Sequence, residues 1–432
     1  MNKRIKWLRN QFVSLKLDGM IVSNPLNVRY LTGLSEEGFL ILGPKENIFV
    51  TDSRYVESVN KNLTIDDEIV VYDVKNLSKY DYEGIFMLSN AVGFEEKYVT
   101  YEQYKDYLQK FQVELIETEG LIEKQRSVKE QEEIDIIQKA CDITSDAFEY
   151  IIKNIKVGMT EKQVAFEIEK YMITHGADGL AFDSVVAFGE NTSMPHAVPT
   201  DRVVKSGDII QFDIGCKYQG YCSDFSRVVF VDEVKEEYKP VYDFVKEEQR
   251  KVAYWLKEGA NIKTVIKDRM TEYRLANYDV LHAFGHGVGL EIHELPRISA
   301  NVDNILKGNS IIALEPGVYI PGKFGIRIED TFLVERTESR AITHGEKDYT
   351  IIHLVGDNEP NKCECNCESI KSEVSAKEDT AESAENIEDV KSDTNLEDNK
   401  NVTEVNNKPQ EVRQLNANHN HMHNKKNRKI HR

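Results

Sequence analysis

The stretch FDIGCKYQGYCSD, residues Phe212–Asp224, carries two aspartates within two strand-like runs. A turn at Lys217–Gly220 joins these runs, and positions at equal distance from a turn face each other in a hairpin. This register places Asp213 opposite Asp224, with Cβ atoms roughly 5 Å apart. Two carboxylates that close repel each other, and a divalent cation such as Mn, Mg or Co would remove the repulsion. The alternative is a solvated hairpin with two chance acids, which the apolar neighbours of both residues disfavour.

A second pair of acids follows the same pattern further along the chain. Glu315 and Glu329 are symmetric about Gly322, so a second hairpin would bring them together. Alternation of side chains along the returning strand puts Arg327 on the same face as Glu329. Pro316 interrupts regular pairing, so we expect a bulge or a strand end there. Two acidic hairpins indicate a pair of metal ions more strongly than either hairpin alone.

The two hairpins lie on a weak internal repeat. Residues 155–164 (IKVGMTEKQV) resemble residues 256–265 (LKEGANIKTV), and Gly259 follows Gly158 by 101 residues. The acids of the two hairpins are separated by a similar interval. A long helix precedes each repeated segment, and a strand-rich region follows it. We therefore predict a duplicated helix–helix–sheet unit with an internal pseudo-two-fold axis, with sequence convergence as the alternative.

A glycine-rich loop between the hairpins carries three histidines. It reads HAFGHGVGLEIHELP and spans His282–Pro296. Its glycines disfavour a helix and allow the backbone to approach a ligand closely. His286, between two glycines, is well placed to bind a metal, whereas His282 and His293 are candidates for metal ligands or for hydrogen bonds to a substrate. A single histidine is usually a satisfied polar residue, but three in such a loop favour function.

Composition excludes several classes of protein. The chain has 432 residues, of which 40% are hydrophobic, and a formal net charge of −19. This charge predicts no nucleic-acid partner and no binding to anionic membranes, because both require clustered Lys and Arg. The charged N-terminus predicts no signal peptide, and no run approaches the roughly 18 apolar residues of a membrane helix. The six cysteines do not form a disulfide framework, so we expect a cytoplasmic protein.

Three regions of the chain differ in composition and in their pattern of strand-like and helical runs. Residues 1–124 alternate strand-like and helical runs, which predicts a small α/β domain, and residues 125–357 hold the repeated unit with the candidate ligands. Residues 358–432 contain few large apolar side chains, so we predict a disordered tail. Its motifs Cys363–Cys367 and His419–His423 either handle metal ions or belong to an extension without a catalytic role.

Together these motifs resemble the metallopeptidase family with the pita-bread fold, which includes aminopeptidase P, prolidase and methionine aminopeptidase. The resemblance also covers Phe182–Ala187, Pro195–Asp201 and Glu315–Tyr319. Asn27–Gly33 and Thr51–Tyr55 extend it to an N-terminal domain like that of creatinase. The resemblance implies an α/β N-terminal domain followed by an α+β pita-bread catalytic domain.

The resemblance implies two divalent metal ions and assigns their ligands. Asp213 would chelate one ion, and His286 and Glu315 would complete the second. Asp224 and Glu329 would bridge both. A bridging water that becomes hydroxide near neutral pH would attack the peptide carbonyl. Manganese is the expected metal, with Co, Zn or Fe as alternatives.

The resemblance also implies roles in the reaction. His196 and His293 would contact the substrate and stabilise the tetrahedral intermediate. Glu315 would also carry a proton to the leaving amine. Arg327 is expected to orient Glu329 rather than to contact the substrate.

The two-domain layout and the segment Pro195–Pro199 favour hydrolysis of the bond between an N-terminal residue and proline. The substrate would be a proline-containing dipeptide or a longer peptide, and a homodimer is the default expectation for this family. One alternative is a methionine aminopeptidase-like specificity, whose members normally lack a large N-terminal domain. The other is a non-catalytic peptide-binding member of the fold, which the complete set of ligand residues disfavours.

Overall fold

The computed structural model describes residues 2–63, 68–354 and 363–365, and these described residues belong to one compact unit. The predicted tail therefore falls outside the described residues, with one exception. Cys363–Cys365 form a short strand, β21, at the edge of a sheet, where they pair with β20 (Thr350–Ile352). The His419–His423 motif lies outside the described part of the chain.

The N-terminal part is built around a six-stranded sheet with the order β4-β3-β2-β1-β5-β6. The pairs β1–β2 and β2–β3 are antiparallel, and the other three pairs are parallel. This mixed sheet confirms the predicted α/β class. Its elements are α1 (Lys3–Leu15), β1 (Gly19–Val22), α2 (Pro25–Thr32), β2 (Gly38–Leu42), β3 (Asn47–Thr51), α3 (Val56–Asn62), β4 (Ile69–Asp73), η2 (Val74–Asn76), α4 (Lys79–Ile85), β5 (Ala91–Phe94), α5 (Tyr101–Phe111), β6 (Glu114–Glu117) and α6 (Leu121–Arg126).

The next part begins with two helices, α7 (Gln131–Ile152) and α8 (Glu161–Thr174), which pack against strands β8, β9 and β12. Helix α7 forms because its apolar residues recur every three or four positions and are buried on one face. A capping box at Thr160 and Gln163 begins α8, as the sequence predicts. The strands of this half are β7 (Gly179–Leu180), β8 (Val185–Phe188), β9 (Ile209–Ile214), β10 (Cys216–Tyr218), β11 (Tyr221–Cys222) and β12 (Phe225–Val231), with the short helix η3 (Gly189–Ser193) after β8.

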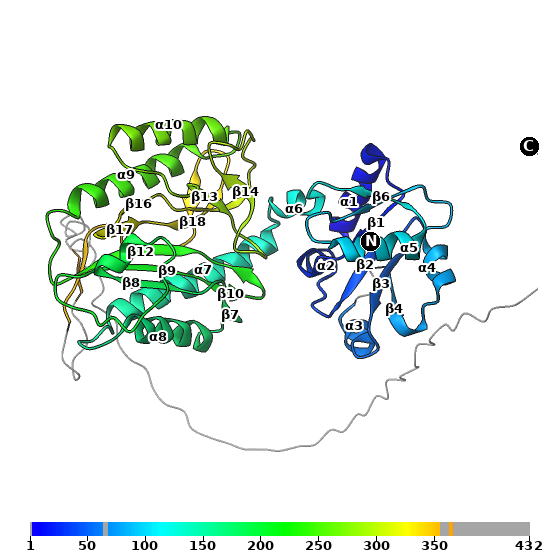
Figure 1. Ribbon diagram of the computed structural model, residues 1–432, viewed down its shortest axis with the longest axis horizontal. Coiled ribbons are helices and arrows are strands. Elements are labelled where there is room, and N and C mark those ends of the chain that lie inside the picture. Colours follow the sequence, from blue (N-terminus) through cyan, green and yellow to red (C-terminus); the bar gives the residue numbers. More distant parts are fainter. Residues whose placement is uncertain (1, 64–67, 355–362, 366–432) are drawn as a thin grey trace, which may run out of the picture. The chain divides into compact units, whose positions relative to one another are not determined.

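The following half repeats this plan. Helices α9 (Lys239–Trp255) and α10 (Ile262–Leu275) lie on the opposite side of the strands from α8 (Figure 1). They pack against the second group of strands. These strands are β13 (Gly285–Gly287), β14 (Glu294–Ile298), β15 (Ile311–Leu314), β16 (Gly317–Ile320), β17 (Phe324–Arg327), β18 (Asp330–Val334) and β19 (Ser339–Ala341).

Local geometry supports the duplication. Gly158 and Gly259 both adopt positive φ angles, of 89° and 86°. The caps that follow them, Thr160 and Asn261, each accept a hydrogen bond from the third residue of the next helix. Each cap residue also forms an isolated antiparallel bridge, to Val203 in the first half and to Ile305 in the second. Equivalent residues therefore make equivalent contacts in the two halves.

The predicted register of the first hairpin is wrong by two positions. Its turn contains only Gln219 and Gly220, both with positive φ, because Tyr218 pairs directly with the residue after them. Such two-residue turns match the twist of the flanking strands. Asp213 therefore lies opposite Ser226 rather than opposite Asp224. Asp224 falls between strands β11 and β12.

The second hairpin has the predicted register. β15 pairs with β18, and β16 pairs with β17, in the pairing that symmetry about Gly322 requires. Strand β15 ends before Glu315 and β16 begins after Pro316, so the proline separates two strands as predicted. Glu315 and Glu329 consequently lie at the junction between two sheets.

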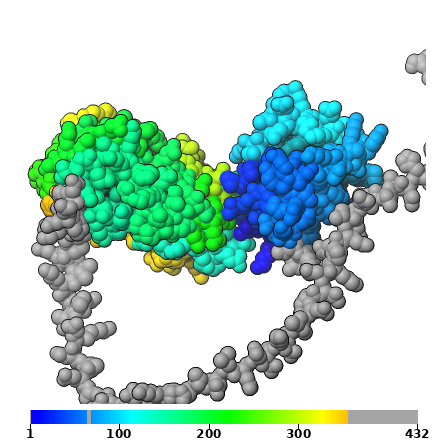
Figure 2. Space-filling model, turned by 90° about the horizontal axis from the view of Figure 1, so that it is seen from below, coloured from blue at the N-terminus to red at the C-terminus, as the bar shows by residue number. Residues whose placement is uncertain are grey.

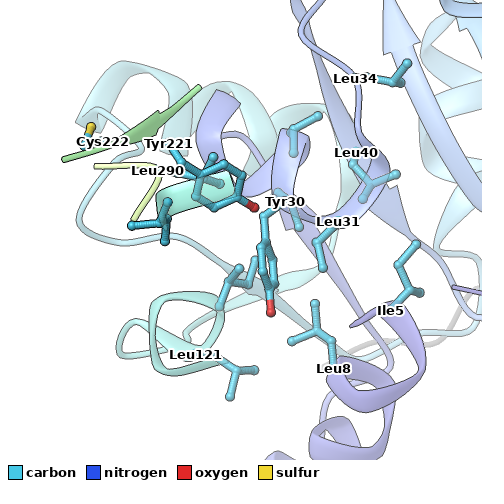
Figure 3. Close-up of a cluster of buried hydrophobic side chains, with 14 of the residues drawn as sticks. Ile5, Leu8, Tyr30, Leu31, Leu34, Leu40, Leu121, Tyr221, Cys222 and Leu290 are labelled. Carbon is cyan, nitrogen blue, oxygen red and sulfur yellow. The ribbon is translucent and has the colours of Figure 1, made fainter. Parts of the chain in front are cut away.

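One apolar cluster joins the N-terminal part to both of the halves that follow it. It contains Ile5 and Leu8 of α1 together with Tyr221 and Leu290 from the hairpin and the glycine-rich loop (Figure 3). The Arg29 guanidinium also donates to the carbonyl oxygen of Gln219 at 2.8 Å. Figure 2 shows dark blue N-terminal residues against green residues of the part that follows.

The tight turn yields a stability prediction. Gly220 has φ +76°, and a Cβ there would also lie 2.5 Å from the Arg29 guanidinium. We expect Gly220→Ala to lower the free energy of unfolding by roughly 1–2 kcal/mol in urea denaturation, because an L side chain disfavours this backbone conformation. Gly84→Ala is the control, since Gly84 lies in α4 with no atom within 4 Å of its Cβ position. That change should stabilise by roughly 0.5–1 kcal/mol. A Gly220→Ala variant as stable as the parent would contradict the argument.

Candidate metal centre

The five predicted ligands lie in or beside five different strands, which meet where the two halves join. Asp213 lies near the end of β9, and Asp224 immediately precedes β12. Glu315 follows β15, Glu329 precedes β18, and His286 is the central residue of β13. The backbones of Ser226 and Glu329 pair through hydrogen bonds of 3.4 and 3.0 Å. This pairing brings ligands from the two sheets into one place.

Three of these side chains form a group with metal-binding spacing. Ligand atoms of Asp224, His286 and Glu329 all lie within 4.8 Å of one another. The Nε2 atom of His286 is 3.4 Å from Asp224 Oδ2 and 3.7 Å from Glu315 Oε1. The structure thus brings Glu315 to the edge of the same group.

Burial and mutual repulsion raise the pKa values of three of the acids. The pKa of Asp224 is raised well above its usual value, first by burial and then by the charges of Glu329 and Asp213. The pKa of Glu329 is raised in the same way by burial, Asp213 and Glu315. Burial raises the pKa of Glu315 to about 8, although Arg327 opposes the shift. These groups would release their protons to a cation far more readily than they ionise alone.

The imidazole of His286 is neutral at physiological pH, as a metal ligand must be. Burial lowers its pKa to about 4, and the neighbouring His293 contributes in the same direction. Its Nδ1 atom lies 3.1 Å from the carbonyl oxygen of Gly287, which can accept the ring proton. Nε2 is then free of its proton on the side that faces the acids.

Asp213 provides a test of whether the residues fit a metal ion. Its Oδ2 accepts a hydrogen bond of 2.5 Å from Arg327 Nη2. Within the described part of the chain, its other oxygen, Oδ1, is buried and has no hydrogen-bond partner. An orphaned carboxylate oxygen is costly to bury, and a cation would satisfy it. The donor set of carboxylates and one imidazole suits a divalent metal.

Arg327 connects two of the acids. Besides its bond to Asp213, its Nε donates to Ser226 Oγ at 3.1 Å, and that hydroxyl donates to Glu329 Oε2 at 2.7 Å. Its Nη1 donates to Tyr319 Oη at 2.6 Å. Hydrogen bonds thus link Arg327 to Glu329 through Ser226, whereas the direct contact of Arg327 with Asp213 was not predicted.

The other predicted histidines surround this centre. The ring of His293 packs edge-on against that of His286, with centroids 4.4 Å apart. Burial lowers the pKa of His293, although the charge of Asp213 opposes the shift. His196 is exposed like His293, and the carbonyl oxygen of its chain neighbour Pro195 accepts a hydrogen bond from Arg327 Nη1 at 3.1 Å. His282 instead hydrogen-bonds Tyr319 through Nε2 at 3.0 Å, and its Nδ1 is 3.7 Å from Glu315 Oε2.

Sequence reasoning missed three polar residues that contact Glu329 or Arg327. Ser226 was overlooked because the wrong hairpin register did not place it opposite Asp213. Gln211 accepts the backbone N–H of Arg327 at 2.8 Å and is buried in β9. Tyr319 was noted only as the end of a motif. Correct pairing of the first hairpin would have pointed to Ser226, but no sequence signal marked Gln211.

Comparison with known proteins identifies the family. Residues 135–336 match the Metallopeptidase family M24, and residues 4–128 match the Creatinase/Prolidase N-terminal domain. The chain is 34% identical over 364 residues to an uncharacterized peptidase of Bacillus subtilis, which covers 81% of this chain and 100% of the relative. It is 31% identical to the Xaa-Pro dipeptidase of Pyrococcus furiosus, over 81% of this chain and 99% of that protein. The chain belongs to metallopeptidase family M24.

Solved structures of this family share the fold. The Xaa-Pro dipeptidase from Bacillus anthracis is similar with a TM-score of 0.75 and 33% identity, over 81% of this chain and 99% of that one. The X-Pro aminopeptidase from Thermotoga maritima is similar with a TM-score of 0.71 and 30% identity, over 78% of this chain and 98% of that one.

Membership of the M24 family confirms three predictions. The chain has the creatinase-like N-terminal domain and the pita-bread domain, and it belongs to a family of peptidase enzymes. The family is one of metallopeptidases, which implies a divalent metal.

Among the described residues, no helix is both long and apolar enough to span a membrane. The domain boundaries at residues 124 and 357 stay predictions.

The bridging position of Ser226 predicts its effect on metal affinity. Ser226→Ala removes the hydroxyl that links Arg327 to Glu329. We expect manganese affinity to weaken roughly 10-fold or more, as for other residues that orient metal ligands, when binding is measured by calorimetry. Ser184→Ala is the matched control, because within the described chain Ser184 Oγ is buried without a hydrogen-bond partner. Equal affinities for the two variants would refute the role of Ser226.

The raised carboxyl pKa values predict how metal-free protein responds to pH. Folded Glu315, with a pKa of about 8, binds a proton that the unfolded chain has already released, so stability falls as pH rises toward 8. The lowered pKa of His286 acts in the opposite direction, but only below about pH 6.5, where an unfolded histidine is protonated. The melting temperature of chelator-treated protein should therefore drop between about pH 6.5 and pH 8.5, and Glu315→Gln should reduce this drop. An identical drop in both proteins would contradict the assignment.

Proposed function

We propose that this chain hydrolyses the peptide bond between an N-terminal residue and a following proline, with two divalent metal ions at the candidate centre. The observation that carries the proposal is the convergence of buried acids whose pKa values rise through burial and mutual repulsion. A neutral histidine faces them. The proposed ligands are Asp213, Asp224, His286, Glu315 and Glu329.

The contacts support a division of the ligands between two ions. Asp213 lies against Arg327, whereas His286 lies beside Glu315 and Asp224. Asp213 would therefore bind one ion and the pair His286 and Glu315 the other, with Asp224 and Glu329 shared. When bound, the ions would polarise the scissile carbonyl and lower the pKa of an attacking water.

The protein's own side chains would orient the substrate and move the proton. His196 and His293 are exposed, so they are accessible to a peptide. His293 packs against His286, and Pro195, the chain neighbour of His196, accepts a hydrogen bond from Arg327. We assign them to hydrogen bonds with the substrate carbonyl oxygen as negative charge develops there. Glu315, which is close to both His282 and His286, would carry the proton to the leaving amine. Arg327 would hold Asp213 in place.

Specificity for proline is supported by the names of the relatives. The curated relative from Pyrococcus furiosus is called an Xaa-Pro dipeptidase, and the similar Thermotoga maritima structure is an X-Pro aminopeptidase. These names agree on proline and differ on the length of the peptide. Manganese as the metal, a homodimer and a cytoplasmic location stay predictions.

The decisive experiment compares three peptides. Protein stripped of metal is assayed with an Xaa-Pro dipeptide, an Xaa-Pro-Yaa tripeptide and a Met-Ala peptide, with and without added manganese. We expect manganese-dependent cleavage of at least one proline peptide and none of Met-Ala. Asp224→Asn should abolish this cleavage, because Asp224 is the proposed ligand with the closest contact to His286.

The outcomes separate the alternatives. Preferred cleavage of the dipeptide would identify a dipeptidase, and preferred cleavage of the tripeptide an aminopeptidase. Cleavage of Met-Ala alone would replace the proposal with a methionine aminopeptidase-like specificity. Folded protein that binds metal and cleaves none of the peptides would overturn it in favour of a peptide-binding role.

A further inference from the structure

The loop between β13 and β14 connects two residues of the candidate centre. His286 lies on β13, and His293 immediately precedes β14. The backbone of Gly287 pairs with that of Glu294, which fixes the base of the loop. The Glu294 side chain folds back beneath the loop, since a Cβ on Gly289 would lie 2.4 Å from its Oε1. Glu294 is therefore both the chain neighbour of His293 and part of the support of the loop.

Two buried cations hold the Glu294 carboxylate. Arg126 Nη2 donates to its Oε2 at 2.6 Å, and Lys129 Nζ donates to its Oε1 at 2.7 Å. The exposed fractions of these side chains are 2% for Arg126, 1% for Lys129 and 3% for Glu294. Burial raises the pKa of Glu294, but the two cations outweigh burial and leave the pKa below its usual value. The carboxylate is thus ionised and fixed from two directions.

The cations come from the segment that connects the N-terminal part to α7. Arg126 ends α6, and its Nη1 donates to Asn27 Oδ1 of α2 at 2.9 Å. The same guanidinium binds Glu291 in the loop through Nη2 at 2.8 Å. Leu290, the residue before Glu291, lies in the apolar cluster with Tyr30 (Figure 3). The N-terminal part therefore contacts the loop through both charges and apolar side chains.

Stability alone is a weak reason for such a cluster. Buried ion pairs seldom stabilise a protein more than well-packed apolar residues of the same volume would, because the charges must first lose their hydration. What the cluster provides is a fixed direction for the chain at Glu294. We propose that Arg126, Lys129 and Glu294 are positioning residues that hold the His293 imidazole beside His286 for contact with the substrate. This inference rests on the proposed function of His293.

A double-mutant cycle tests the positioning role. In the parent protein, Glu294→Gln should lower kcat/KM for the favoured proline peptide by about 10-fold, within the range for supporting residues of a site. In a His293→Ala background, the same change should lower kcat/KM by less than about 2-fold, because the residue it positions is absent. If the loss of kcat/KM in the double variant equals the product of the two single-variant losses, the proposal is overturned.

A matched variant separates positioning from general destabilisation. Glu248 of α9 is also a buried carboxylate with two cationic neighbours, Lys251 at 3.0 Å and Arg269 at 3.4 Å. Glu248→Gln removes a comparable charge from a part of the fold that contributes none of the proposed site residues. It should change kcat/KM by less than about 2-fold. A loss as large as that of Glu294→Gln would show that destabilisation alone explains both.

A measurement without substrate keeps this inference distinct from the proposed function. Hydrogen–deuterium exchange of residues 287–295 should become at least about 10-fold faster in Glu294→Gln and remain unchanged in Glu248→Gln. Unchanged exchange in Glu294→Gln would overturn the positioning role even if the enzyme cleaves proline peptides. If exchange is accelerated in Glu294→Gln but the parent protein cleaves no proline peptide, Glu294 still anchors the loop. In that case only the proposed function is overturned.

A milder variant covers the case in which Glu294→Gln does not fold. Lys129→Met keeps most of the apolar stem of the side chain and removes one of the two charges on Glu294. It should accelerate exchange in residues 287–295 and lower kcat/KM, both by a smaller factor than Glu294→Gln. Unchanged exchange and unchanged kcat/KM in Lys129→Met would also overturn the proposal.

Discussion

The repulsion between carboxylates at the junction of the two halves is the constraint on which the rest of the site depends. Two like charges about 4 Å apart repel by about 4 kcal/mol at the effective dielectric constant of a protein, and burial adds the loss of hydration. The fold nevertheless holds Asp224 and Glu329 almost completely buried. Such an arrangement is stable only with protons or cations on the acids. The site therefore takes up positive charge as a condition of its own stability.

The duplicated scaffold explains how acids from distant parts of the chain reach this junction. Each half supplies helices that cover one side of its strands, so the strand ends of both halves are left to meet in the middle. The backbone bridge between Ser226 and Glu329 joins the two sheets at that point. Glu329 of one half is thereby fixed by main-chain hydrogen bonds relative to β12 of the other half, which Asp224 immediately precedes. Main-chain pairing is more rigid than contact between long side chains, which suits a site that must hold its shape.

The sequence predicted the composition of the site better than its geometry. Motif spacing identified the acids and the histidine that converge, and the internal repeat predicted the two equivalent halves. The register of the first hairpin depended on a left-handed conformation at Gln219, and glutamine carries no signal for it. The buried contacts of Ser226 and Gln211 likewise depend on which strands become neighbours in three dimensions. Local patterns do not encode such pairings, whereas they do encode capping at Thr160 and the break at Pro316.

The acids at the junction differ in their charged neighbours, and this difference decides at which acids a metal competes with protons. Arg327 donates directly to Asp213, so this acid has a permanent positive partner. Asp224, Glu315 and Glu329 carry the raised pKa values, and burial is the largest cause for each. A divalent ion that enters must displace protons from this second group, which couples metal affinity to pH. Arg327 thus gives Asp213 a cationic partner, whereas the other three acids carry the raised pKa values that couple them to a metal.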